Sequence, residues 1–275
     1  MKWVDYASPH SIREAVDLLA AHGDDAKMMA GGTDMLVLLR AGLSAKMVVD
    51  VKDIPELNEI TYDPTAGLTL GAAVPCYRIY GNAAVSNAYP GLIDAASLIG
   101  GTQIQGRASI GGNLCNAAPS GDSIPALIAL EAKANIAGPD GSRQVAAEDF
   151  CIAPRRTVLK IGEIVTSIHL PPPAPNTGAR YLRFIPRNEM DIAVAGAGVS
   201  VALDNGTFKA ARVALASVAP TPLFVREAGE ALVGQPVHVR RLDQRVAVGA
   251  AEHGGVLIGH GYEQVGPVSP CCTHH

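Results

Sequence analysis

Charged and aromatic residues are scarce in this chain of 275 residues. They make up 17% and 4% of it, and the formal net charge is only −4. A weakly acidic chain without a dense basic cluster is not expected to bind nucleic acid as its main partner. Hydrophobic residues instead reach 48%. A chain of this length can bury enough of them to form one large domain or two to three small ones.

Cysteines are also few, and their spacing does not suit a metal site. Cys76, Cys115, Cys151, Cys271 and Cys272 form no C-x-x-C pair, so zinc or iron–sulfur ligation within this chain is not expected. An isolated cysteine is usually a small buried hydrophobe. Cys115 is of more interest than the others because it lies just after a glycine pair.

No hydrophobic run in the sequence is long. The longest, at residues 192–203, is too short to span a bilayer. The first five residues lack the long apolar core of a signal peptide. We therefore expect no membrane span and a cytoplasmic location.

The common nucleotide-binding loops are missing as well. There is no G-x-x-x-x-G-K-[ST], and the nearest approach to G-x-G-x-x-G starts at Gly196 and has Val201 where the third glycine belongs. Two of the Gly-Gly pairs in the sequence are of interest instead, at residues 31–32 and 111–112, each next to a small polar residue. A dinucleotide held without a Rossmann loop is therefore our first hypothesis.

The two glycine pairs suit a phosphate group. Glycine accepts positive φ and lets a ligand approach the backbone closely, and successive N–H groups in a turn can form a concave nest for an anion. Either pair alone is more often a plain tight turn. Together they indicate two walls around a single diphosphate, the first at the junction of a strand and a helix.

The apolar pattern predicts a mixture of helices and strands. It favours helices over 12–21, 35–39, 77–84, 92–99, 124–131 and 225–233, and strands over 3–6, 27–30, 48–51, 60–62, 68–71, 134–136, 164–170, 180–185, 192–203 and 213–217. Residues 204–206, D-N-G, predict a hairpin turn. The proline run at 171–175 is the strongest boundary signal, because such a run forms a stiff, extended connector.

Four motifs resemble those of a known family, the flavin-binding medium subunit of molybdenum hydroxylases, which includes carbon monoxide dehydrogenase and the multi-subunit xanthine dehydrogenases. They are A-G-G-T-D at 30–34, I-G-G-N-L-C-N-A-x-P at 110–119 followed by Asp122, M-D-I-A at 190–193, and V-A-P-T-P at 218–222. Their order and spacing fit the family too. The resemblance covers roughly residues 3–236.

The resemblance implies an α+β protein in which a two-lobed FAD-binding fold is followed by a small α+β C-terminal domain. The FAD-binding fold would be of the PCMH type, as in vanillyl-alcohol oxidase-like flavoproteins. We expect lobe 1 over residues 1–55, lobe 2 over 56–175 and the C-terminal domain over 176–275. From about residue 237 the sequence is glycine-rich and poorly patterned, which makes an atypical tail for this family.

The resemblance also implies that FAD lies extended between the lobes, with its diphosphate against both glycine pairs. The residues expected to bind it are Met28, Met29, Ala30, Gly31, Gly32, Thr33, Asp34, Ile99, Ser109, Ile110, Gly111, Gly112, Asn113, Asp122, Val165 and Arg183.

Each polar residue has an expected role. The four glycines would offer N–H groups to the phosphates, and Thr33, Ser109 and Asn113 would add side-chain hydrogen bonds. Asp122 would accept hydrogen bonds from sugar hydroxyls in the ribose–adenine half. Arg183 would place positive charge near the isoalloxazine ring and favour an anionic reduced flavin.

Two of these residues have structural alternatives. Arg183 could be a solvated charge on an edge strand, which is the usual place of an arginine. Asp34 could serve as the N-cap of the helix that follows it.

Ile99 and Val165 would be apolar contacts of the cofactor.

The family's division of labour implies that this chain performs no substrate chemistry, and we expect no catalytic and no metal-binding residue in it. A large subunit with the molybdenum cofactor would oxidise the substrate, and a small subunit with 2Fe-2S clusters would pass electrons to the FAD of this chain. The FAD would reduce an external acceptor, in a dimer of heterotrimers. Two alternatives are a stand-alone flavoprotein oxidoreductase and a cofactor-free assembly subunit.

Overall fold

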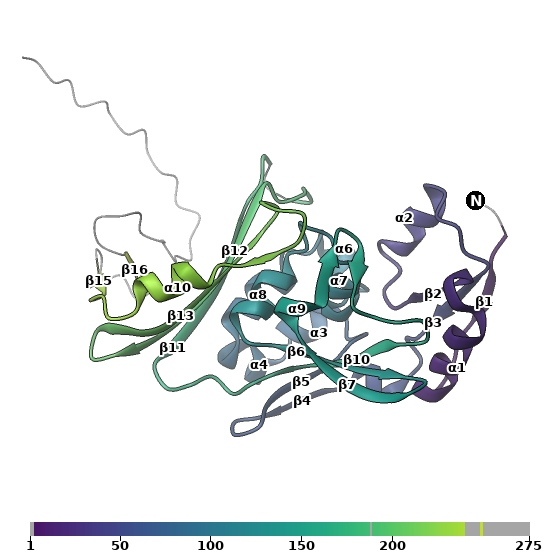
Figure 1. Cartoon of the computed structure of the whole chain (residues 1–275), viewed down its shortest axis with the longest axis horizontal. Helices are drawn as coiled ribbons and strands as arrows, with labels where there is room; N and C mark the ends of the chain where they lie inside the picture. Colours follow the sequence, from purple (N-terminus) through teal and green to yellow (C-terminus); the bar gives the residue numbers. More distant parts are fainter. Residues whose placement is uncertain (1–2, 188, 240–247, 250–275) are drawn as a thin grey trace, which may run out of the picture.

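The computed structural model describes residues 3–187, 189–239 and 248–249. It contains three main sheets that follow one another along the chain and along the long axis of the molecule (Figure 1). The atypical tail expected from about residue 237 falls almost entirely outside the described residues. The residue limits of the lobes, at 55 and 175, stay predictions.

The first sheet is parallel and small. Its strand order is β1-β3-β2, and its elements are β1 (Asp5–Ala7), α1 (Ile12–His22), the 3-10 helix η1 (Gly23–Asp25), β2 (Ala26–Met29), α2 (Met35–Arg40) and β3 (Met47–Asp50). Helix α1 begins at Ser11, whose Oγ accepts a hydrogen bond from the N–H of Glu14 at 3.2 Å, as an N-cap does. The first glycine pair lies between β2 and α2, as predicted.

The second sheet has five antiparallel strands in the order β4-β5-β10-β6-β7. Its strands are β4 (Ile60–Asp63), β5 (Gly67–Gly71), β6 (Lys133–Gly138), β7 (Gly141–Ala146) and β10 (Ile164–Leu170). The elements between and before them are η2 (Pro55–Asn58), α3 (Cys76–Tyr80), α4 (Ala83–Ala88), α5 (Pro90–Ala96), α6 (Thr102–Gln105), α7 (Ile110–Asn116), α8 (Ser123–Ala129), α9 (Ala147–Phe150), β8 (Cys151–Ala153) and β9 (Arg156–Thr157).

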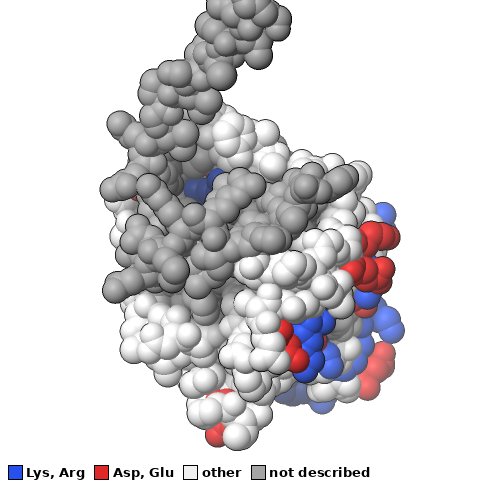
Figure 2. Space-filling view, turned by 90° about the vertical axis from the view of Figure 1, so that its left-hand side faces the viewer, with Lys and Arg blue, Asp and Glu red and all other residues white. Residues whose placement is uncertain are grey.

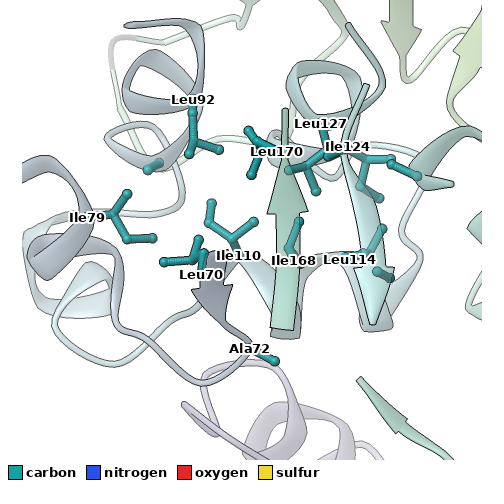
Figure 3. Packing of buried hydrophobic residues seen from close by; sticks show 14 of the residues in the cluster. Leu70, Ala72, Ile79, Leu92, Ile110, Leu114, Ile124, Leu127, Ile168 and Leu170 are labelled. Atoms are coloured by element: carbon teal, nitrogen blue, oxygen red, sulfur yellow. The ribbon is translucent and has the colours of Figure 1, made fainter. Parts of the chain in front are cut away.

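The largest hydrophobic core lies between this sheet and its helices (Figure 3). Strands β5 and β10 contribute Leu70, Ile168 and Leu170, and helices α3, α5, α7 and α8 contribute Ile79, Leu92, Ile110, Leu114, Ile124 and Leu127. Each is almost fully buried, which stabilises the fold by about 1.5–3 kcal/mol per side chain. This core gives α7, which carries the second glycine pair, a fixed position on the sheet.

A second core joins the first sheet to the second. Ala15, Val16 and Leu19 of α1 pack with Val49 of β3 and with Ile164 at the start of β10. All five are buried. The two sheets therefore hold the two glycine pairs in one packed unit.

The third sheet is antiparallel, in the order β11-β12-β13-β14. Its elements are β11 (Thr177–Phe184), β12 (Ala195–Asp204), β13 (Thr207–Ala216), β14 (Leu223–Phe224) and the helix α10 (Arg226–Leu232), and the short strands β15 (His238–Val239) and β16 (Val248–Gly249) pair beyond them. The predicted hairpin turn after β12 is present, with Asn205 and Gly206 at φ of 49° and 78°. Seen from the end formed by this sheet and α10, the described surface carries basic and acidic side chains next to one another (Figure 2).

Glycines of β12 allow close packing of the third sheet, on helix α8 and within the sheet itself. An ideal Cβ on Gly198 would lie 2.5 Å from the carbonyl oxygen of Pro125, so the strand backbone rests directly on α8. An ideal Cβ on Gly196 would lie 2.5 Å from Oη of Tyr181. The partial nucleotide fingerprint at this point of the sequence therefore serves close packing.

One predicted helix is wrong. Instead of a single helix over 77–84 the chain forms α3 and α4, separated at Gly81 and Asn82. Asn82 Oδ1 accepts hydrogen bonds from the N–H groups of Ala84 and Val85, at 3.1 and 3.3 Å, and so begins a new helix. None of the helices in the described part of the chain is long and apolar enough to cross a membrane.

Candidate cofactor-binding site

A cleft of about 200 Å³ lies between the β2–α2 segment and the segment around α7. All of the expected cofactor-binding residues line it except Ile110, Asp122 and Arg183. The cleft is smaller than the pockets of about 300–1,000 Å³ that bury a drug-sized ligand. A dinucleotide bound here must therefore extend beyond it.

The two glycine pairs meet at the cleft through their backbones. An ideal Cβ on Gly31 would lie 2.2 Å from the carbonyl oxygen of Arg107. The Arg107 Nε–H in turn donates to the carbonyl oxygen of Gly31 at 2.9 Å. Asn116 Nδ2 donates to Asp34 Oδ2 at 3.2 Å and forms a second link between the segments. Only glycine fits at position 31, because any side chain would push the two segments apart.

Three of the four glycines in the two pairs are needed, and for different reasons. Gly32 alone has positive φ, at 77°. Gly111 does not have positive φ, but it faces the turn that follows β5, where its Cβ would lie 2.4 Å from the carbonyl oxygen of Ala72. Gly112 is exposed. The second pair lies in the first turn of α7, not in the free turn that we expected.

Hydrogen-bond donors are available along the cleft. No carbonyl in the described part of the chain accepts from the N–H groups of Gly31, Gly32 or Thr33. Ser109 is the N-cap of α7, and its Oγ accepts from the N–H of Gly112 at 3.0 Å, which leaves the hydroxyl proton free to be donated. Free N–H groups beside a hydroxyl suit an anion such as a diphosphate.

The cleft also has an apolar lining. Its residues are Met28, Leu38, Ile99, Cys115 and Val165. Burial raises the pKa of the Cys115 thiol to about 12, so the sulfur stays protonated at neutral pH and acts as an apolar surface, not as a nucleophile. A flat, largely apolar ring system fits against these apolar side chains.

Asp34 takes the N-cap position of α2, but its side chain makes no capping hydrogen bond. Its carboxylate accepts instead from Asn116 of α7. Asp34 therefore stands at the N-cap position, as the structural alternative had it, but its side chain does not cap the helix. Ile110 is fully buried in the core beneath α7, so it supports the site from below.

Asp122 and Arg183 form a buried ion pair next to the cleft. Arg183 Nη1 donates to Asp122 Oδ2 at 3.1 Å, and the Tyr181 hydroxyl donates to Asp122 Oδ1 at 2.8 Å. The side chains of Arg183 and Asp122 are only 5% and 11% exposed. β11 is an edge strand, but Arg183 is not a solvated charge. Burial raises the pKa of Asp122, while the Arg183 charge and the Tyr181 hydroxyl oppose that rise.

Sequence reasoning missed three polar residues that shape the cleft. Arg107 and Asn116 link the two glycine segments, and Ser123 binds the side chain of Asn113. Arg107 is conspicuous in the sequence, because it is the only charged residue between Asp94 and Asp122, but it was not among the predicted binding residues. The described residues contain no group of three or more His, Cys, Asp or Glu side chains that could hold a metal ion.

Comparison with known proteins agrees with this geometry. Residues 2–173 match the model of the FAD binding domain in molybdopterin dehydrogenase, and residues 180–253 match that of the CO dehydrogenase flavoprotein C-terminal domain. The chain is similar to the xanthine dehydrogenase FAD-binding subunit of Escherichia coli O157:H7, at 33% identity over 87% of this chain and 83% of the relative. It is also similar to the carbon monoxide dehydrogenase medium chain of Afipia carboxidovorans, at 34% identity over 90% of this chain and 85% of the relative.

Solved structures show the same fold. A chain of the carbon monoxide dehydrogenase from Hydrogenophaga pseudoflava that lacks the Mo-pyranopterin moiety of the molybdenum cofactor superimposes with a TM-score of 0.83 at 33% identity, over 86% of this chain and 82% of that one. The predicted family, the fold of an FAD-binding unit followed by a C-terminal domain, and the cofactor are thereby confirmed. The chain belongs to the family of FAD-binding flavoprotein subunits of the molybdopterin dehydrogenases, to which the xanthine dehydrogenase FAD-binding subunit and the carbon monoxide dehydrogenase medium chain also belong.

Proposed function

We propose that this chain is the flavin subunit of a multi-subunit molybdenum hydroxylase, and that it holds the diphosphate of FAD between its two glycine pairs. The observation that carries this proposal is the close approach of Gly31 to the Arg107 carbonyl oxygen, at a place where no side chain fits. That approach brings hydrogen-bond donors from distant parts of the chain to the same cleft: the N–H groups of residues 31–33 and the side chains of Ser109 and Asn113.

Different residues of the cleft would bind different parts of FAD. The N–H groups of Gly31, Gly32 and Thr33 would bind phosphate oxygens from one side, and the hydroxyl of Ser109 and the amide of Asn113 would bind from the other. The apolar lining formed by residues such as Ile99 and Val165 would exclude water from the ring system. Arg183 and Asp122 would keep the third sheet in place behind the cleft, since their ion pair joins β11 to α8.

Bound FAD would supply a redox centre that collects single electrons and releases them in pairs. The cleft is too small to enclose the whole cofactor, so part of it would stay accessible to a donor and an acceptor. We propose an iron–sulfur small subunit as the donor and a molybdenum-cofactor large subunit as the place of substrate oxidation. Relatives named as a medium chain and as an FAD-binding subunit support a multi-subunit complex over a stand-alone oxidoreductase. The dimer of heterotrimers, the external acceptor and the cytoplasmic location remain predictions.

Purification from the native host, without a tag on this chain, tests the proposal. We expect the chain to copurify with two other polypeptides, one with iron and one with molybdenum, and to carry one FAD. A flavin-loaded chain that is purified alone and is reduced directly by a small-molecule substrate would support the stand-alone alternative. A complex that contains this chain without flavin would support the assembly-subunit alternative.

A further inference from the structure

The amide of Asn113 lines the cleft from the first turns of α7. An asparagine amide has an acceptor on one side and a donor on the other, so its orientation decides whether it attracts or repels a phosphate. The side that faces the cleft is therefore important for binding an anion.

Ser123 determines that orientation. Both its N–H and its Oγ lie within hydrogen-bond distance of Asn113 Oδ1, at 3.2 and 2.6 Å. A backbone N–H can only donate, so the atom that faces it must be the amide oxygen. Asn113 Nδ2, with its two N–H donors, then points away from Ser123, on the opposite side of the Cβ–Cγ bond within the amide plane.

Ser123 itself is held firmly. It is completely buried and is the first residue of α8. The preceding residue, Asp122, is bound by Tyr181 and Arg183 of the third sheet. The start of α8 is thus fixed from two sides, and a rotation of the Asn113 amide would leave the Ser123 N–H facing a donor.

We propose that Ser123 is a positioning residue for FAD. It holds the Asn113 amide so that Nδ2 donates to the cofactor diphosphate, although Ser123 does not touch the cofactor. The inference rests on the proposed function, since it requires FAD in this cleft. Without the Ser123 hydroxyl, only the N–H of residue 123 would hold Oδ1, so the amide would rotate more often and present its oxygen to the phosphates, which repel it.

A double-mutant cycle on the full chain tests the proposal, with the FAD affinity of the flavin-free protein as the readout. We expect Ser123→Ala to weaken FAD binding about threefold to tenfold, the contribution of one hydrogen bond, because the Ser123 N–H remains. In an Asn113→Ala background the same substitution should change the affinity less than about twofold, since Ser123 acts only through Asn113. Ser200→Ala is the matched control, because it removes a hydroxyl that donates to the Ala129 carbonyl at the other end of α8, and it should leave FAD affinity unchanged.

The possible failures are distinguishable. If the unmodified chain does not bind FAD, the proposed function is wrong. If it binds FAD and Ser123→Ala binds equally well, or if Ser123→Ala weakens binding by the same factor with and without Asn113, the positioning role is wrong. Thermal unfolding of each flavin-free variant separates a loss of affinity from a loss of fold.

Discussion

Replacement of Gly31 by alanine is expected to abolish FAD retention. The new Cβ would lie 2.2 Å from the Arg107 carbonyl oxygen, so the segments that carry the two glycine pairs must separate. Donors on opposite sides of one diphosphate cannot both reach it after such a shift. The loss of two charge-assisted hydrogen bonds would cost about 3–6 kcal/mol, which is more than a hundredfold in Kd. Flavin content after purification and FAD titration of the flavin-free protein measure the effect.

Gly178→Ala is the matched control for this change. Gly178 lies on β11, and an ideal Cβ there has no heavy atom within 4 Å. This variant should retain flavin at the level of the unmodified chain. If Gly31→Ala also retains it, the two pairs do not share a diphosphate.

Replacement of Asp122 by alanine is expected to lower the free energy of unfolding by about 3–5 kcal/mol, as removal of one partner of a buried ion pair does. Arg183 would remain with 5% of its side chain exposed and without its carboxylate, and the Tyr181 hydroxyl would lose its acceptor. Urea unfolding of the flavin-free protein measures this loss separately from any effect on cofactor binding.

A double substitution provides the comparison for Asp122. Asp122→Leu combined with Arg183→Met removes both buried charges at similar volume, and such replacements are often neutral. The double variant should therefore be more stable than Asp122→Ala. A loss of less than about 1 kcal/mol in Asp122→Ala would show that the pair does not hold the third sheet on α8.

The first half of the site was predictable because its signals are local. A strand, two glycines, a small polar residue and a helix follow one another within residues 26–40, and each step has its own sequence pattern. The apolar run of β10 was predicted over its full length, from Ile164 to Leu170. Local patterns suffice where an element's own residues decide its structure.

The partners of the site could not be predicted in this way. Tyr181 and Arg183 reach Asp122 across some sixty residues of chain, and Ala72, in the turn after β5, excludes a side chain at Gly111 of α7. Spacing along the sequence contains no information on such contacts. The same holds for Gly196 and Gly198, whose spacing resembles a nucleotide loop although they are needed for packing.

The sequence pattern also failed to predict a strand that is mostly polar. Strand β7 (Gly141–Ala146) has the sequence G-S-R-Q-V-A, which lacks the apolar alternation typical of a strand. It forms because β6 pairs with it along its whole length. Tertiary pairing thus decided its structure against its own propensity.

The most direct test of the central claim is a crystal structure of this chain with FAD bound. We expect phosphate oxygens of one diphosphate to lie within hydrogen-bond distance of N–H groups in residues 31–33 and also of donors in residues 109–113. A diphosphate that contacts only one of these segments, or that lies outside the cleft between β2–α2 and α7, would contradict it.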